Sequence, residues 1–421
     1  MLKGVRPVMQ VLLAVAFMEA GLGVLSPLIS LDLAQKNVST SLIGLVTSGY
    51  FTGFLLGTLS CHWVIDRVGH IRAFAVFAAV AGNATLGHII FDQTYAWIAL
   101  RALLGYAFAG QFVVIESWLN DKATDDNRGR IFSYYMAVSW AASGVSPLAL
   151  NFHDQIGSVV LFCIIAMLFG TALIPMALTR VGNPEIGDRE HFGIRKLLSI
   201  SPTGVVVCFG SGLLNSAYYG LLPAYAERVG LSTGELAILF SASTIAGLII
   251  QFPIGFLSDH FGRRPLMLVS LISAAALAAL VASLDTPAFL TLLVVLFLLD
   301  GAIAPLYALG VGQTNDYTAK QDFVAASAGL LFAWGLGSAI GPTVAGFVMG
   351  WLGPFGLFWF MVGGLSLIAT FVTLRILVRR ALSAREQSNY VAVPMTAGTY
   401  GAPELDPRAE PQHHPQKIPD M

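Results

Sequence analysis

Four ionisable side chains lie inside long apolar segments of the chain, where a charge is costly and a functional role is the usual reason for keeping it. They are Glu19, Arg101, Glu116 and Asp300. Protonation of a buried acid changes how it pairs with a nearby cation, so an arginine with acids within reach can couple proton binding to a structural change. The alternative is a static ion pair that only supports the fold.

Helical spacing favours the first interpretation for two of these residues. Positions 101, 105, 108, 112 and 116 share one broad helical face, with Arg101 at one end and Glu116 at the other. Glu19 lies about 11 residues into its apolar segment, near mid-depth at about 1.5 Å per residue. Asp300 lies at a similar depth in its own segment. We therefore predict a proton-coupling network of these four residues.

A second group of residues is suited to line a binding cavity for organic solutes. Asn215, Tyr218 and Tyr219 fall within one helical turn, and Trp140 and Trp334 lie in two other apolar segments. Aromatic rings with a few amides and acids suit amphiphilic or cationic organic solutes, and sugars nearly as well. The alternative is that these aromatic residues face lipid or pack against other helices.

A short polar connection between two apolar segments reads G-x-x-x-D-x-x-G-R-R. Its residues are Gly255, Asp259, Gly262, Arg263 and Arg264. Gly255 lets two helices approach closely, and Gly262 permits a tight turn. The acid and the first arginine can pair with a neighbouring helix end. The alternative is a simple basic loop on the inner side of a membrane.

A worn copy of this pattern occurs in the first half of the chain. Asp66, Arg67 and Gly69 keep the acid, a base and the turn glycine. His62 stands where the first glycine would be, and His70 replaces the first basic residue after the turn. This copy is therefore expected to be weaker or sensitive to pH. Residues 66–72 and 255–264 are called the signature loops below.

The composition requires a lipid environment for the elements that carry these residues. The chain is 56% hydrophobic and only 11% charged, whereas a soluble domain is about 25% charged. Its net charge of −1 leaves no basic surface for a nucleic acid. The three cysteines lie far apart in apolar segments, so neither a disulfide framework nor a metal site is indicated.

Twelve apolar segments are long enough to cross a bilayer, which takes about 20 residues in a helix. None alternates with a period of two, so the predicted fold class is an all-α membrane protein of twelve transmembrane helices. The predicted spans are 8–31, 42–65, 72–91, 95–119, 131–151, 157–179, 203–227, 235–258, 266–285, 288–314, 323–350 and 355–378.

Basic residues predict how these spans are oriented. With the N-terminus in the cytoplasm, almost all lysines and arginines of the connections fall on the cytoplasmic side, and only Lys36 and Arg228 fall on the other. This bias predicts that both termini are cytoplasmic in a multi-pass protein of the cell inner (plasma) membrane.

The two halves of the chain repeat. Asp66 matches Asp259, Asn120-Asp121 matches Asn315-Asp316 and Pro147 matches Pro342, at offsets that differ by only two residues. We therefore predict two pseudo-symmetric six-helix bundles with a solute site near the midplane between them. The predicted domains are residues 1–180, a cytoplasmic linker at 181–202, residues 203–380 and a disordered cytoplasmic tail at 381–421.

The signature loops resemble those of the major facilitator superfamily (MFS) of secondary transporters. The segment from Arg101 to Gly105 resembles that family's fourth-helix motif, R-x-x-x-G. Segments 50–59, 116–120, 127–130 and 219–223 are similar to the YcaD-like branch of bacterial members. The resemblance covers nearly the whole chain up to about residue 378. It implies the MFS fold, and it implies that the signature loops form a latch that helps to hold the cytoplasmic side closed.

The expected function is therefore a secondary active transporter that moves a small organic solute across the inner membrane by alternating access. Coupling to protons is expected, with efflux favoured and uptake of a nutrient or metabolite as the alternative. A non-transporting membrane receptor or scaffold is the alternative of another class. Neither a catalytic constellation nor a phosphate-binding loop occurs, so no enzyme and no cofactor are expected. The expected partners are the solute, protons and the lipid bilayer, with the chain acting as a monomer.

Overall fold

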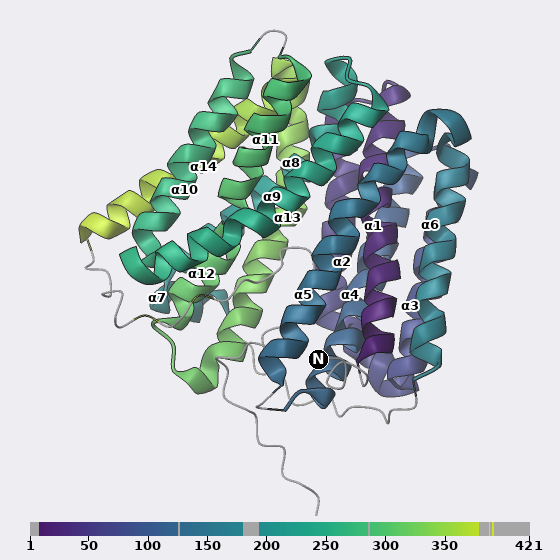
Figure 1. Ribbon diagram of the computed structural model, residues 1–421, viewed down its shortest axis with the longest axis horizontal. Helices are drawn as coiled ribbons and strands as arrows, with labels where there is room; N and C mark the ends of the chain where they lie inside the picture. The colour runs from purple at the N-terminus through teal and green to yellow at the C-terminus, as the bar shows by residue number, and fades with distance from the viewer. Residues whose placement is uncertain are drawn as a thin grey trace, which may run out of the picture.

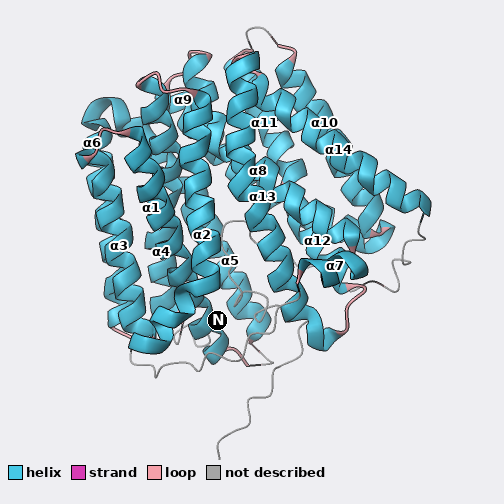
Figure 2. Cartoon of the chain, turned by 180° about the vertical axis from the view of Figure 1, so that it is seen from behind, coloured by secondary structure: helices cyan, strands magenta, loops and turns pink. Residues whose placement is uncertain are grey.

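The computed structural model describes residues 8–124, 127–179, 193–284 and 287–378, together with Gln387 and Tyr390. Within these residues the regular structure is entirely helical (Figure 2). The first half consists of α1 Met9–Gln35, α2 Thr40–Val68, α3 His70–Ile90, α4 Thr94–Lys122, α5 Arg128–Val145, the 3₁₀ helix η2 Ser146–Phe152 and α6 His153–Ala177. The second half consists of α7 Ile194–Ile200, α8 Pro202–Arg228, α9 Thr233–Phe261, α10 Arg263–Ala282, α11 Phe289–Ile303, α12 Pro305–Asn315, η3 Lys320–Asp322, α13 Phe323–Leu352 and α14 Gly356–Val378.

Among the described residues, eleven helical segments are long and apolar enough to cross a membrane. One of them, Arg128–Ala177, has 50 residues, more than twice the roughly 20 that a bilayer needs. It contains η2 and a reversal at Gly157, where φ is 78°, so it crosses as two separate helices, α5 and α6. The part of the chain that the structure describes therefore contains twelve membrane-crossing helices, as predicted.

The observed helices differ from the predicted organisation in two places. The predicted span 288–314 consists of two helices, α11 and α12, that meet at Ala304 and Pro305. Proline has no backbone N–H to continue the hydrogen-bond ladder, which explains the break. Within the predicted linker, the seven residues of α7 are helical. Residues 181–192 of that linker and most of the predicted tail lie outside the described residues.

The helices form two groups that correspond to the two halves of the sequence (Figure 1). In the first group α2 packs against α4, α3 against α4 and α6, and α1 against α5 and α6. In the second, α8 packs against α12 and α13, α9 against α11, and α10 against α14. The groups meet mainly where α2 lies against α13 and α1 against α8.

Several hydrogen bonds join the two halves near the α1–α2 connection. Ser30 Oγ of α1 donates to the Gly220 carbonyl of α8 at 2.8 Å. Thr40 Oγ1 of α2 donates to the Gly346 carbonyl of α13 at 2.8 Å. One turn further along α13, Thr343 Oγ1 bonds to Ser48 Oγ of α2 at 2.8 Å. These contacts hold the halves together at the membrane face that carries residues 36–39, which we call the α1–α2 face.

Candidate functional site

A cavity of about 140 Å³ lies between the two halves. One water molecule needs roughly 10–15 Å³ of cavity volume measured in this way, so the cavity has room for on the order of ten waters or one small organic molecule. Thr47 and Gly220, which contact one another at the interface of the halves, lie in its wall. Its lining residues are Glu19, Leu22, Gly23, Ser26, Thr47, Tyr50, Phe51, Phe54, Arg101, Trp140, Ser143, Asn215, Ser216, Tyr219, Gly220, Phe240, Thr244 and Trp334.

Two glycines fix the position of Arg101 beside α2. A Cβ atom at Gly105 would overlap the carbonyl oxygen of Tyr50, and one at Gly53 would overlap the carbonyl oxygen of Ala102. The backbones of α2 and α4 therefore touch directly at this crossing. The guanidinium of Arg101 lies over the ring of Tyr50, with Cζ 4.6 Å from the ring centroid. The R-x-x-x-G spacing thus has a structural reason in this chain.

The cavity holds two charged side chains, and both come from the first half. Glu19 of α1 is 1% exposed and Arg101 of α4 is 3% exposed. Among the residues that the structure describes, Oε1 of Glu19 and both Nε and Nη1 of Arg101 are buried without a hydrogen-bond partner. No carboxylate of the described chain lies within 4.0 Å of the Arg101 guanidinium. The acid and the base therefore share a cavity without forming an ion pair.

The second half supplies an uncharged wall. Asn215 Nδ2 donates to the Ser211 carbonyl at 3.1 Å, while Asn215 Oδ1 is buried and has no partner among the described residues. The Tyr219 and Phe240 rings pack edge to face at 5.1 Å. The Trp334 ring lies 6.0 Å from the ring of Phe51 in the first half. Aromatic contact across the cavity therefore joins the two halves.

Three of the predicted site residues lie outside this wall. Glu116 is fully buried and accepts a hydrogen bond from Tyr135 Oη at 3.2 Å. Tyr218 Oη bonds to Ser243 Oγ at 2.7 Å. Asp300 is buried in α11 beside Gly247 of α9. The structure thus brings Glu19, Arg101, Asn215, Tyr219 and Trp334 together in the wall, along with Trp140. Tyr218 and Asp300 lie behind the wall, where both are close to the Tyr219 side chain, and Glu116 lies beside Tyr135.

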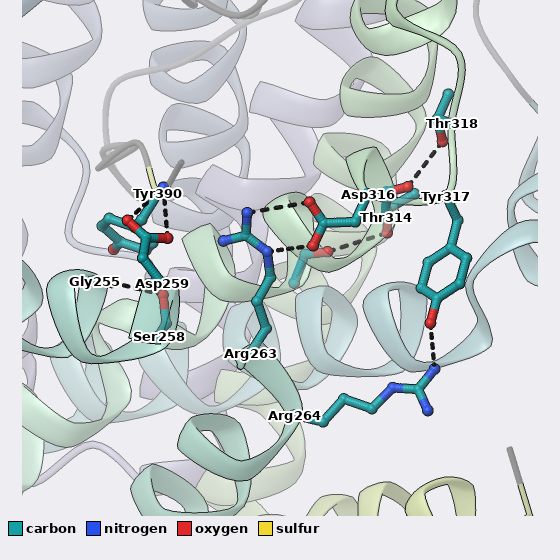
Figure 3. Close-up of polar contacts among 11 residues, drawn as sticks. Gly255, Ser258, Asp259, Arg263, Arg264, Thr314, Asp316, Tyr317, Thr318 and Tyr390 are labelled. Carbon is teal, nitrogen blue, oxygen red and sulfur yellow. Dashed lines mark hydrogen bonds and ion pairs between the residues drawn. The ribbon is translucent and has the colours of Figure 1, made fainter. Parts of the chain in front are cut away.

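The second signature loop is folded into a polar cluster (Figure 3). Gly262 ends α9 with φ at 89°, a conformation that favours glycine. Arg263 Nε and Nη2 contact the two carboxylate oxygens of Asp316 at 2.5 and 3.2 Å. The side chains of this pair are 0% and 1% exposed. Arg264 Nη2 donates to Tyr317 Oη at 3.2 Å. Both arginines therefore reach the end of α12.

Asp259 of the same loop has a different partner. The backbone N–H of Tyr390 donates to both carboxylate oxygens of Asp259, at 2.9 and 3.1 Å (Figure 3). The Tyr390 ring lies against Gly255, where a Cβ atom would overlap it. This contact was not predicted, because the sequence from residue 381 onward has the composition of a disordered tail.

The first signature loop keeps the turn of the second but has an exposed acid and base. Gly69 has φ at 81° and forms the turn between α2 and α3, as Gly262 does between α9 and α10. Asp66 and Arg67 are exposed, and neither forms a hydrogen bond or an ion pair within the described part of the chain. Asp121, the repeat counterpart of Asp316, pairs with its neighbour Lys122 at the surface. The first copy therefore keeps the turn, but its Asp66 and Arg67 are exposed, whereas Arg263 and Asp316 of the second copy are buried.

Sequence reasoning missed several residues of the site. Tyr50, Phe51 and Phe54 belong to a segment recognised only for its family resemblance, and they form the α2 wall of the cavity. Phe240 of α9 gave no signal beyond its place in an apolar run. Asp316 did give a sequence signal, because Asn315-Asp316 repeats Asn120-Asp121. The repeat alone does not identify Arg263 as the partner of Asp316.

Comparison with known proteins agrees with this architecture. The model of the Major Facilitator Superfamily matches residues 11–234 and 204–398. The uncharacterized MFS-type transporter YcaD of Escherichia coli (strain SMS-3-5 / SECEC) is 31% identical over 377 residues, covering 88% of this chain and 96% of the relative. YcaD of Shigella dysenteriae serotype 1 (strain Sd197) gives the same values.

Two solved structures share the fold at 14% sequence identity. The crystal structure of the nucleoside transporter NupG has a TM-score of 0.70 and covers 88% of this chain and 99% of its own. A bacterial homolog of the human lysosomal transporter Spinster, in an inward-facing and occupied conformation, has a TM-score of 0.72 and covers 92% and 99%. The family match, the identity to YcaD and the two six-helix bundles together show that this chain is a multi-pass membrane transporter of the Major Facilitator Superfamily.

Proposed function

We propose that this transporter moves a small organic solute across the cell inner membrane by alternating access, with the central cavity as its solute site. The observation that carries the proposal is a cavity shared by both halves that contains an acid and a base without an ion pair. The hydrogen bonds at the α1–α2 face lie on one side of this cavity. Rocking one bundle against the other would break these contacts and open the cavity to that side.

The proposed orientation has the signature loops and both termini in the cytoplasm. The excess of lysine and arginine on that side supports it. The test is to label single cysteines with a membrane-impermeant thiol reagent on intact cells, in a variant without native cysteines. We expect labelling at Lys36→Cys and none at Arg67→Cys until the cells are opened. The reverse pattern would overturn the orientation.

Proton coupling is proposed to act through Glu19 first, because Glu19 lies in the solute cavity itself. A carboxyl that gains or loses a proton there changes the charge that a solute meets. Arg101 shares the cavity and would sense that change, while Glu116 and Asp300 would act from outside the wall. This proposal keeps the predicted four-residue network and gives its members different positions.

The test of transport uses proteoliposomes with a pH-sensitive dye inside and a library of solutes outside. A transported, coupled solute changes the internal pH, and its radiolabelled form exchanges across the membrane. We expect Glu19→Gln to abolish the solute-evoked pH change while solute exchange continues. Glu227→Gln, at the end of α8 and outside the cavity, is the matched control. Full solute-evoked pH change in Glu19→Gln would contradict the assignment.

Export is the proposed direction, and uptake of a nutrient or metabolite is the alternative. The aromatic wall supports export of amphiphilic compounds, because apolar contacts with aromatic rings do not require one exact orientation of the bound molecule. A deletion strain that becomes sensitive to amphiphilic drugs supports export, whereas one that fails to grow on a particular nutrient supports uptake. Because one chain carries both halves of the site, we propose that the monomer is the working unit. Cross-linking in membranes tests this point.

A further inference from the structure

We propose that the solute is a small apolar organic acid with one negative charge, whose carboxylate binds Arg101 and whose far end donates a hydrogen bond to Asn215. This inference rests on the proposed solute cavity and names the class of molecule that fits it. It follows from the polar groups in the wall that lack partners, and from the side of the cavity on which each one lies.

Arg101 is the cation of this cavity, and part of its hydrogen-bonding capacity is unused. Its guanidinium is a planar group with five N–H donors, and Nε and Nη1 are buried without partners among the described residues. The Tyr50 ring covers the guanidinium at 4.6 Å but accepts no conventional hydrogen bond from its edge. A buried cation left in this state is unfavourable unless an anion joins it. A carboxylate fits because its two oxygens match two N–H groups of arginine.

The charge on the solute is limited to one. Arg101 is the single lysine or arginine among the cavity-lining residues, so a second negative charge would have no cation to meet. Glu19 lies in the same wall, and in its ionised form it would repel a dianion such as a phosphate monoester. A monocarboxylate satisfies Arg101 without creating a further unpaired charge.

The opposite wall selects an apolar body with a donor at its end. Tyr219, Phe240 and Trp334 of the second half are uncharged and mostly aromatic. Asn215 Oδ1 is a buried acceptor in this wall and has no partner among the described residues, because the side-chain amide nitrogen is the group that bonds to Ser211. An O–H or N–H group on the solute would satisfy it. The solute would then bridge the two halves, with its anion on the first and its donor on the second.

The experiment compares four probes that share one apolar body. They are 3-(4-hydroxyphenyl)propionate, the corresponding amide, 3-phenylpropionate without the hydroxyl group, and the amine tyramine. Binding to the purified full-length transporter in nanodiscs is measured by isothermal titration calorimetry at neutral pH. We expect the hydroxylated acid to bind at least about tenfold more tightly than its amide or the amine, because only the carboxylate forms charge-assisted bonds to Arg101. The acid without the hydroxyl group should bind several-fold more weakly than the hydroxylated acid.

Three variants assign these preferences to residues. Arg101→Gln should reduce the affinity for the hydroxylated acid to that for the amide, and Arg101→Lys should keep part of the preference. Asn215→Leu should remove the advantage of the hydroxyl group and leave the preference for the carboxylate. Arg195→Gln removes a charge at an exposed position of α7, outside the cavity wall, and is the matched control.

Several outcomes would overturn the inference. A preference for the carboxylate that survives in Arg101→Gln would place the anion elsewhere. Tightest binding of tyramine, lost in Glu19→Gln, would assign the solute charge to the opposite sign. Failure of all four probes to bind would reject the class. In each case the solute-evoked pH assay with a wider library of solutes tests the transport proposal separately, because that assay does not assume that the solute carries a carboxylate.

Discussion

Replacing Asp316 by asparagine should destabilise this transporter far more than the same replacement at its repeat counterpart, Asp121. Asp316 accepts two contacts from Arg263, and the side chains of that pair are 1% and 0% exposed. Asp121 pairs with Lys122 at 2.7 Å, but these two side chains are 38% and 32% exposed. The two sites therefore carry the same residue in the same repeat position and differ in burial.

Burial sets the expected magnitude. Removing one partner of a buried ion pair costs roughly 3–5 kcal/mol, because the remaining charge loses its counter-charge in a poorly solvated place. An exposed pair contributes roughly 0–1 kcal/mol. At about 2–4 °C per kcal/mol for a unit of 150–250 residues, Asp316→Asn should lower Tm by on the order of 6–20 °C. Asp121→Asn should lower it by no more than about 4 °C.

The assay is the thermal stability of the purified protein, followed by the loss of its monodisperse peak in size-exclusion chromatography after heating. A double variant separates the charge from the shape of the site. Replacing both Arg263 and Asp316 by leucine should recover a large part of the lost stability, because no unpaired charge then remains. Equal loss of stability in Asp316→Asn and Asp121→Asn would refute the reasoning that burial makes this pair strong.

Two further predictions concern contacts that the same structure shows. Gly105→Ala should destabilise the protein by about 1–3 kcal/mol, because the new methyl group overlaps a carbonyl oxygen of α2. The control is Gly170→Ala, in open space on α6, which should change stability by no more than about 1 kcal/mol. Equal thermal stabilities of the two variants would contradict the close crossing of α2 and α4. Asp259→Asn should speed hydrogen exchange of the Tyr390 amide, which donates to this carboxylate. Asp66→Asn is the control at the repeat position, and unchanged exchange at Tyr390 in Asp259→Asn would mean that the contact is not kept in solution.

Much of the architecture could be predicted from the sequence because a bilayer leaves few choices. A backbone that crosses it must satisfy its own hydrogen bonds, so each apolar segment of about 20 residues becomes a helix. The glycines at 69 and 262 were predicted to turn the chain, and both have the positive φ that such turns use. The separation of α5 from α6 was predicted as two spans, whereas the break between α11 and α12 was not, because hydropathy averages over it.

The site was only partly predictable. Helical periodicity placed Arg101 and Glu116 on one face of α4, but 15 residues at about 1.5 Å each separate them by roughly 22 Å along the axis. Glu116 bonds to Tyr135 of α5, whereas Arg101 lies over Tyr50 of α2. A shared face therefore did not mean a shared environment.

The sequence by itself determined that the chain crosses a membrane in helices, that its halves repeat, and which buried residues can carry charge. Those properties depend on hydropathy and residue type, which are local. Only the tertiary structure decided that Glu19 and Arg101 share a cavity without pairing, and that Arg263 meets Asp316 while Asp259 meets the backbone of Tyr390. These relations depend on how helices far apart in the sequence cross, and the close contacts at small residues such as Gly53 and Gly105 set that geometry.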